Sequence, residues 1–288
     1  TPPCTPTENW PAVRRLVVLV LCGMVLSGCG LFRPAPVTPP RQRCVATIGT
    51  ETASLDLEQS RNASIIAGVA TQRGLSPRAV SIALATAFQE SDIRNIDYGD
   101  RDSIGLFQQR PSQGWGTVQQ IMDPHYSTGK FYDALVKVKG WETGDINDVA
   151  QAVQRSGVPD GYRKHVERAK LLASALSGET PAAWSCLVRE PPSGDLATFQ
   201  TMLTKTYGKA ATFTPQPGTP AVASVVVTTD AAAWSVAAFA QSWTSGAGVT
   251  TVSYNGMVWS VKGDALAGWA AAPTPAPVTT RTVTVQLG

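Results

Sequence analysis

The chain has 288 residues, of which 43% are hydrophobic and 16% charged, and its formal net charge is +3. This length exceeds one ordinary domain, and the 21 prolines gather in stretches typical of linkers, so we expect two folded units with tails. A net charge this small does not supply the basic footprint that nucleic-acid binding requires, which argues against a nucleic-acid partner.

The N-terminal region has the pattern of an export signal. Arg14 and Arg15 precede an apolar run at 16–26, which is shorter than the roughly 20 residues of a membrane-spanning helix. The run ends in LSGC at 26–29, which resembles the lipobox of bacterial lipoproteins. That resemblance implies removal of residues 1–28, lipidation of Cys29 and anchoring on the extracytoplasmic face of the cell membrane. An uncleaved short anchor is the alternative, and residues 1–13 are interpreted as an upstream extension.

The five cysteines divide by position. Cys4, Cys22 and Cys29 lie at or before the apolar run, whereas Cys44 and Cys186 follow it. In an oxidising exterior the latter two would pair as a disulfide, and the alternative is two unpaired thiols. Between them and the anchor, the proline-rich residues 33–40 predict an extended tether within 29–43.

Residues 44–188 are predicted to form a mainly helical domain without a long strand-rich stretch. Apolar residues recur at helical spacing in five segments, 61–74, 76–90, 124–138, 145–155 and 162–176. Ser76 and Pro77 suit the start of the second helix, and its buried stripe runs to Glu90 at the other end. A carboxyl group buried there would have a raised pKa, because its charged form loses solvation. A solvent-exposed charge at the helix end is the alternative.

Three motifs in this domain carry a family resemblance. The segments ATAFQES at 85–91, GLFQ at 105–108 and AQAVQ at 150–154 with Tyr162 resemble, in this order, the motifs of lytic transglycosylases. Residues 83–162 are similar in particular to actinobacterial cell-wall proteins that contain DYGDRD and GLFQQRP, found here at 97–102 and 105–111. The resemblance implies a lysozyme-like fold with Glu90 in a glycan-binding cleft.

The implied activity is cleavage of peptidoglycan between N-acetylmuramic acid and N-acetylglucosamine by Glu90 as acid and then base. A glutamic acid kept neutral by its surroundings can protonate the leaving oxygen, and the sugar's own C6 hydroxyl can close a 1,6-anhydro ring without a second carboxylate. No cofactor or metal is expected. The resemblance, with Trp115 added as a sugar-stacking candidate, gives these substrate-binding residues: Ser91, Gly105, Leu106, Phe107, Gln108, Trp115, Gln154 and Tyr162.

Other functions are compatible with the sequence. Where many transglycosylases carry Ala-Tyr-Asn, this chain has Ala152, Val153 and Gln154, so a non-catalytic lipoprotein that binds glycan or an envelope partner is the alternative. A lysozyme-type hydrolase is a further enzymatic possibility. Asp97, Asp100 and Asp102 are expected to form rigid turns rather than a calcium loop or a second catalytic carboxylate. Trp141 is expected to stack on a sugar or to pack in the core. His125 and His165 are expected at the surface.

The C-terminal third is predicted to be a small α+β domain at 222–288, preceded by a helix and a proline-rich hinge within 189–221. The helix covers 195–207 and the hinge 215–220. Strands are expected at 222–228, 249–254, 257–262 and 280–287, and an amphipathic helix at 230–243. The Asn255-Gly256 pair predicts a tight hairpin. The whole chain is therefore expected to be α+β, with a wall-binding or partner-binding role for this last unit.

Overall fold

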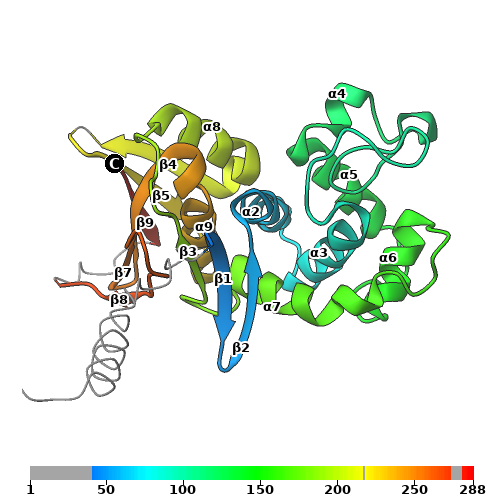
Figure 1. Cartoon of the computed structure of the whole chain (residues 1–288), viewed down its shortest axis with the longest axis horizontal. Coiled ribbons are helices and arrows are strands. Elements are labelled where there is room, and N and C mark those ends of the chain that lie inside the picture. Colours follow the sequence, from blue (N-terminus) through cyan, green and yellow to red (C-terminus); the bar gives the residue numbers. More distant parts are fainter. Residues whose placement is uncertain (1–40, 217, 274–280) are drawn as a thin grey trace, which may run out of the picture. The chain divides into compact units, whose positions relative to one another are not determined.

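The computed structural model describes residues 41–216, 218–273 and 281–288 of the chain. The predicted signal peptide, Cys29 and nearly all of the predicted tether lie outside these residues. Across the described ranges, no helix has both the length and the apolar character needed to cross a membrane. Helices and two antiparallel sheets make up an α+β fold, which confirms the predicted class (Figure 1).

The longer described helices are α2 (Leu57–Gln72), α3 (Pro77–Ser91), α5 (Pro124–Leu135), α6 (Ile146–Gln154), α7 (Val166–Leu176), α8 (Leu196–Tyr207) and α9 (Asp230–Ser242). The short helical segments are η1 (Pro111–Gln113), α4 (Val118–Ile121), η2 (Arg163–His165), η3 (Gly208–Ala210) and α10 (Thr244–Ala247). The strands are β1 (Arg43–Ile48), β2 (Glu51–Leu55), β3 (Trp184–Leu187), β4 (Ala211–Gln216), β5 (Ala221–Val227), β6 (Val249–Tyr254), β7 (Met257–Ser260), β8 (Ala270–Ala271) and β9 (Thr282–Leu287).

The smaller sheet joins the two ends of the predicted central domain. Strand β1 lies between β2 and β3, and both pairings are antiparallel. Cys44 on β1 faces Cys186 on β3, and the two form a disulfide, so the predicted pairing is confirmed. The β1–β2 hairpin was not predicted from the sequence, because its strands are short. The chain turns between the two strands at Gly49, whose φ of +60° suits glycine.

Helix α3 is the central helix of the helical part. It packs against α2, α5, α6 and α7, and its residues from Ala79 to Phe88 are buried. Ala79, Ala83 and Ala87 have small side chains, so neighbouring helix backbones can approach closely. The helix begins at Pro77, as the sequence predicts, and its last turn carries Glu90.

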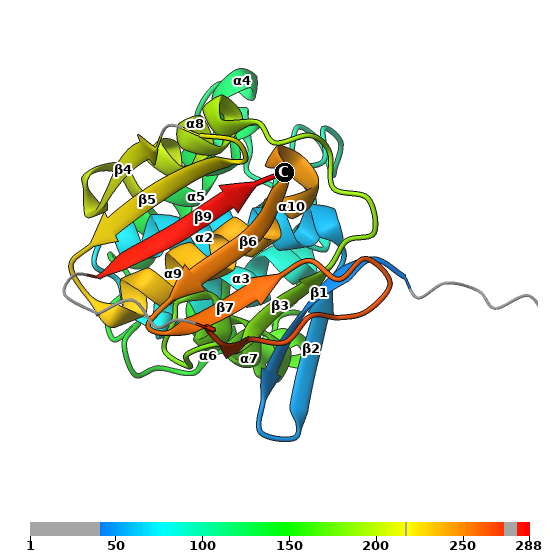
Figure 2. The ribbon, with the colours of Figure 1, turned by 90° about the vertical axis from the view of Figure 1, so that its left-hand side faces the viewer.

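The larger sheet has the strand order β4-β5-β9-β6-β7-β8, and helix α9 covers one of its faces (Figure 2). Strands β6 and β7 meet at Asn255 and Gly256, whose φ values of 50° and 71° fit the predicted tight hairpin. On its other side α9 packs against α2 and α7. The helix is therefore buried around its whole circumference instead of being amphipathic.

The predicted C-terminal unit packs on the predicted central domain. Among the described residues, Trp234 and Phe239 on α9 belong to the same core as the helices around α3. Residues 215 and 216 of the predicted hinge form the end of β4, which pairs antiparallel with β5. Pro215 is tolerated there because β4 is an edge strand of the sheet.

Reduction of the Cys44–Cys186 disulfide should destabilise the fold. The bond closes a loop with a sequence separation of 142 residues. In the chain-entropy model a loop of this size contributes about 5 kcal/mol through the unfolded state. We expect the denaturant midpoint to fall on reduction or in Cys44→Ser/Cys186→Ser, measured by circular dichroism. An unchanged midpoint would contradict this estimate.

Candidate functional site

Glu90 stands on the last turn of α3, where the chain leaves the helix in a strained conformation. Asp92 and Ile93 both have positive φ, 54° and 57°, which a β-branched residue such as isoleucine rarely adopts. Ile93 is held there by burial and by Asn62, whose Nδ2 donates to its carbonyl oxygen at 2.8 Å. Strain of this kind is often found at functional sites, and it fixes the point at which Glu90 is presented.

Glu90 lies on the wall of a cleft with a volume of about 1450 Å³. This exceeds the roughly 300–1000 Å³ of ordinary small-molecule pockets, so the cleft has room for an oligomeric ligand. Gln108, Trp115 and Gln154 line the cleft together with Glu90. The structure thus brings four of the predicted site residues to one cavity.

Tyr162 contacts Glu90 directly. Its hydroxyl donates a hydrogen bond to Glu90 Oε1 at 2.7 Å, and its ring is fully buried. Burial raises the pKa of the Glu90 carboxyl, while hydrogen bonds from Tyr162 and Gln154 act in the opposite direction without cancelling the effect. Burial and the adjacent carboxyl also raise the pKa of Tyr162, so this hydroxyl stays a donor at neutral pH. Glu90 is consequently a weaker acid than an exposed glutamate.

Backbone groups of the loop at 105–108 connect it to the helix that carries Glu90 and to α6. Gly105 has a φ of +78°, and a Cβ atom there would lie 2.9 Å from the carbonyl oxygen of Ile121, so only glycine fits. The carbonyl oxygens of Leu106 and Phe107 accept hydrogen bonds from the side chains of Ser91 at 2.8 Å and Gln154 at 2.7 Å. These two bonds fasten the loop to α3 and α6.

Apart from Gly105 and Tyr162, the predicted substrate-binding residues fall into two groups. Gln108, Trp115 and Gln154 line the cleft. Ser91, Leu106 and Phe107 are buried, and Phe107 stacks on Phe131 with 4.6 Å between ring centroids. The members of the second group thus support the cleft from inside the protein.

The aspartates of the loop at 97–102 have different roles. Asp102 accepts hydrogen bonds from Arg110 Nε at 2.7 Å and from the backbone N–H of Ser112 at 2.8 Å, and these contacts hold its pKa well below the ordinary value. Asp102 thereby ties two parts of the loop together. Asp100 lines the cleft, but 91% of its side chain is exposed. The described residues contain no group of three His, Cys, Asp or Glu side chains arranged to hold a metal ion.

Some of the minor expectations need correction. His125 is not a surface residue: 11% of its side chain is exposed, and its ring nitrogens contact Asp123 at 3.1 Å and Thr206 at 3.0 Å. His165 is half-buried, with its ring stacked on Phe88. Trp141 is buried in the core, so of its two predicted roles the structure selects packing.

The basic side chains of the cleft were not predicted from the sequence. They are Arg101, Arg110, Lys130, Lys137 and Arg155. Lys130 and Lys137 are seven positions apart on one face of the predicted helix 124–138, a spacing that could have suggested a basic strip. Asp133 between them is engaged by Arg73 Nη1 at 2.8 Å, so its charge is already compensated. Arg110 and Arg101 are paired in the same way with Asp102 and Asp100, so the basic character of the cleft walls comes from Lys130, Lys137 and Arg155.

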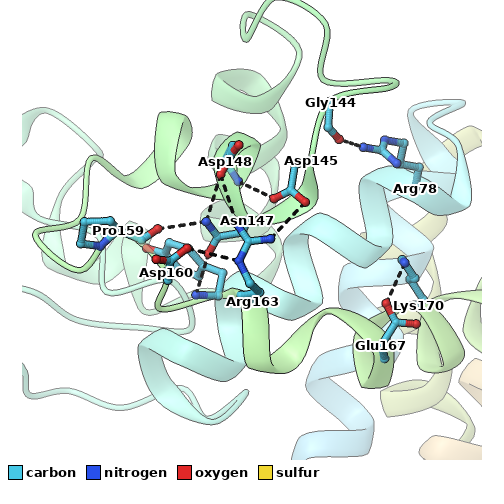
Figure 3. A network of polar contacts seen from close by, with 11 residues as sticks. Arg78, Gly144, Asp145, Asn147, Asp148, Pro159, Asp160, Arg163, Glu167 and Lys170 are labelled. Atoms are coloured by element: carbon cyan, nitrogen blue, oxygen red, sulfur yellow. Dashed lines mark hydrogen bonds and ion pairs between the residues drawn. The ribbon is translucent and has the colours of Figure 1, made fainter.

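A second missed feature is the polar network around Asn147 and Arg163 (Figure 3). Asn147 is buried on the first turn of α6, whereas Arg163 is half-exposed and follows Tyr162 in the chain. Asn147 and Arg163 belong to no motif in the sequence. Their contacts with the Tyr162 segment could not be predicted, because they depend on how the chain after α6 folds back.

Comparisons with known proteins do not identify a relative. The sequence matches no protein-family model, and no curated protein matches it. The geometry of the cleft and the motif resemblance are therefore the observations that bear on function.

Glu90→Gln should stabilise the protein at neutral pH. The raised pKa of Glu90 means that its stabilising contribution is present below the pKa of an unfolded glutamate and is lost as pH rises through the folded value. A neutral amide avoids this loss. We expect the melting temperature of the variant to exceed that of the wild type at pH 7, by about 2–4 °C for each kcal/mol.

The difference in melting temperature should shrink toward pH 4, where Glu90 is protonated in the folded wild type. Scanning calorimetry across this pH range provides the measurement. A difference that is constant with pH, or that favours the wild type at pH 7, would contradict burial of the charged carboxyl.

Proposed function

We propose that this protein is a peptidoglycan lytic transglycosylase with Glu90 as its single acid/base. The observation that carries the proposal is the shielded Glu90 carboxyl, which has a raised pKa and is held by Tyr162 on the wall of a large cleft. A carboxylic acid in this state can remain protonated nearer neutral pH and donate its proton to a leaving oxygen.

In the proposed reaction Glu90 protonates the glycosidic oxygen, and the bond to C1 of N-acetylmuramic acid breaks. The C6 hydroxyl of the same sugar then attacks C1, and its proton passes to the Glu90 carboxylate. This forms the 1,6-anhydro ring and restores the acid. The Tyr162 hydroxyl occupies Glu90 Oε1, which favours the other oxygen for the transfer.

One carboxyl is sufficient for this chemistry, because the attacking hydroxyl belongs to the substrate. The other carboxylates lining the cleft are poor candidates for a nucleophile. Asp133 is paired with Arg73, and the Asp100 side chain is almost fully exposed. Neither has the shielded environment of Glu90, which favours a transglycosylase over a two-carboxylate hydrolase.

We further propose that the protein is lipid-anchored through Cys29 outside the cell membrane. The Cys44–Cys186 disulfide supports an oxidising location, since such bonds persist outside the cytoplasm. Residues 26–29 supply the lipobox-like motif. Peptidoglycan is the partner that this location would present.

A binding protein without catalysis is the second candidate. The observation in its favour is the wall at 152–154, where Ala152 is exposed, Val153 is buried and no aromatic ring is available to grip a sugar. Gln154 uses its amide to hold Phe107. Such a protein would keep the cleft for glycan and leave the bond intact.

The two candidates differ in a digest of purified peptidoglycan. The enzyme should release 1,6-anhydromuropeptides detected by mass spectrometry. Glu90→Gln should lower the rate by about 10²- to 10⁴-fold while its circular dichroism spectrum stays unchanged. Products with free reducing ends would indicate a hydrolase. Binding to the wall material without release of any product would support the second candidate.

The basic cleft walls should favour an acidic glycan over a neutral one. Lys130 and Lys137 have no acidic partner among the described residues, so they are available to the carboxylates of muramic acid or of its peptide. Each exposed charge pair is worth about 0.2–1 kcal/mol. The Lys130→Gln/Lys137→Gln variant should therefore bind muropeptide oligomers roughly 2- to 30-fold more weakly.

Affinity measured by calorimetry for neutral chitin oligosaccharides should stay the same in that variant. Lys139→Gln, which removes an exposed lysine outside the cleft lining, serves as the matched control. An equal loss of affinity for acidic and neutral oligosaccharides would contradict a role for the lysine charges.

A further inference from the structure

The position of Tyr162 is not fixed by a helix or a strand. Tyr162 lies at the end of an irregular segment between α6 and η2, and residues 155–161 of that segment form a loop on the cleft side. Loop positions of this kind move readily unless specific bonds hold the backbone. The hydrogen bond from Tyr162 to Glu90 therefore depends on what fastens this segment.

Asn147 holds this segment in place through hydrogen bonds of both polar atoms of its side chain. Its Oδ1 accepts from the backbone N–H of Tyr162 at 3.2 Å. Its Nδ2 donates to the carbonyl oxygen of Pro159 at 2.9 Å and to Asp148 Oδ1 at 3.1 Å. Asn147 itself is 1% exposed, and a buried polar group whose bonds are all satisfied specifies one geometry.

Arg163 adds a second connection in the same place (Figure 3). Its guanidinium contacts Asp145 at 3.3 Å, Asp148 at 3.7 Å and Asp160 at 3.2 Å. Because 54% of the Arg163 side chain is exposed, solvent screens these ion pairs and each contributes little. Between the two connections, the buried Asn147 is the one that determines where the Tyr162 backbone lies.

We propose that Asn147 is a positioning residue for the acid: it fixes the Tyr162 backbone and so holds the Tyr162 hydroxyl on Glu90. Helix α6 then acts on the site at both of its ends, since Asn147 on its first turn secures Tyr162 and Gln154 on its last turn secures the Phe107 carbonyl. The inference deepens the proposed function and depends on it for its catalytic meaning.

The test compares the titration of Glu90 in a set of variants. Tyr162 is the titratable group that touches Glu90. Other titratable or charged groups near it are His165, which contacts the adjacent Gln89, and the cleft-lining Asp100, Arg101, Arg110, Lys130, Asp133, Lys137 and Arg155. The substitutions leave all of these other groups in place, and also Gln154, the second hydrogen-bond donor to Glu90. A shift that Asn147 and Tyr162 variants share without adding therefore reports on the hydrogen bond from Tyr162.

The Glu90 carboxyl is followed by NMR in the full chain with ¹³C-labelled glutamate, and Glu90→Gln assigns its signal. Tyr162→Phe should raise the pKa of Glu90, because the charged form loses a hydrogen bond. Asn147→Ala should raise it in the same direction, and the double variant should raise it no further than Tyr162→Phe alone. The pH at which activity falls on the alkaline side should rise in parallel, because Glu90 stays protonated to higher pH.

Ser235→Ala is the control, because it removes a buried hydroxyl that contacts Tyr207 at 3.0 Å in the α9 layer. It should destabilise the fold and leave the Glu90 titration unchanged. If Asn147→Ala does not fold, Asn147→Ser carries the same expectation with a smaller cavity.

An Asn147 variant that titrates like the wild type would overturn the inference, and so would additive effects of the two substitutions. The titration needs no substrate. Coupled shifts in a protein that releases no anhydromuropeptide would therefore retain Asn147 as the positioning residue while the proposed activity fails.

Discussion

The hydrogen bond from Tyr162 to the half-buried Glu90 carboxyl is the contact on which the proposed chemistry of the molecule depends. Partial burial disfavours the charged form of Glu90, and the hydrogen bonds from Tyr162 and Gln154 do not offset that effect. The protein therefore holds an acid in a state that is costly for stability and useful for proton transfer. The surrounding packing has to supply the stability that this site withholds.

That stability comes from a core that extends through the whole described unit. Helix α2 connects the two parts, with α3 on one side and α8 and α9 on the other. Gly68 on α2 permits the close approach, since a Cβ atom there would lie 2.3 Å from Thr206 Cγ2. Thr206 also contacts His125 at the start of α5. The C-terminal sheet layer thus braces the helices that carry the cleft.

The sequence predicted much of this arrangement wherever a local pattern carried the signal. Helical spacing located the main helices within a few residues, Asn255-Gly256 located the hairpin, and the division of the cysteines gave the disulfide. The shared core could not be predicted in this way. A proline-rich segment suggests a hinge, but β4 pairs with β5 in the structure, where α8 packs against β4 and α9 against β5.

The site was predictable to a similar degree. The order of the motifs predicted four site residues, Glu90, Gln108, Gln154 and Tyr162. The structure brings their side chains to one region. Spacing in the chain could not show that Ser91 and Phe107 point into the protein, because Ser91 bonds to the Leu106 carbonyl and Phe107 stacks on Phe131, and both contacts depend on the tertiary fold. Asn147 was missed for the same reason, since its partners lie on a returning loop.

The state of one carboxyl in the wild-type protein tests this account most directly. The pH at which Glu90 loses half of its protons can be measured by NMR in the folded chain without substrate. The account predicts a midpoint above the ordinary glutamate value of about 4.3. A midpoint at or below that value would show a solvated carboxylate, and Glu90 would then lack the property on which its proposed role as an acid depends.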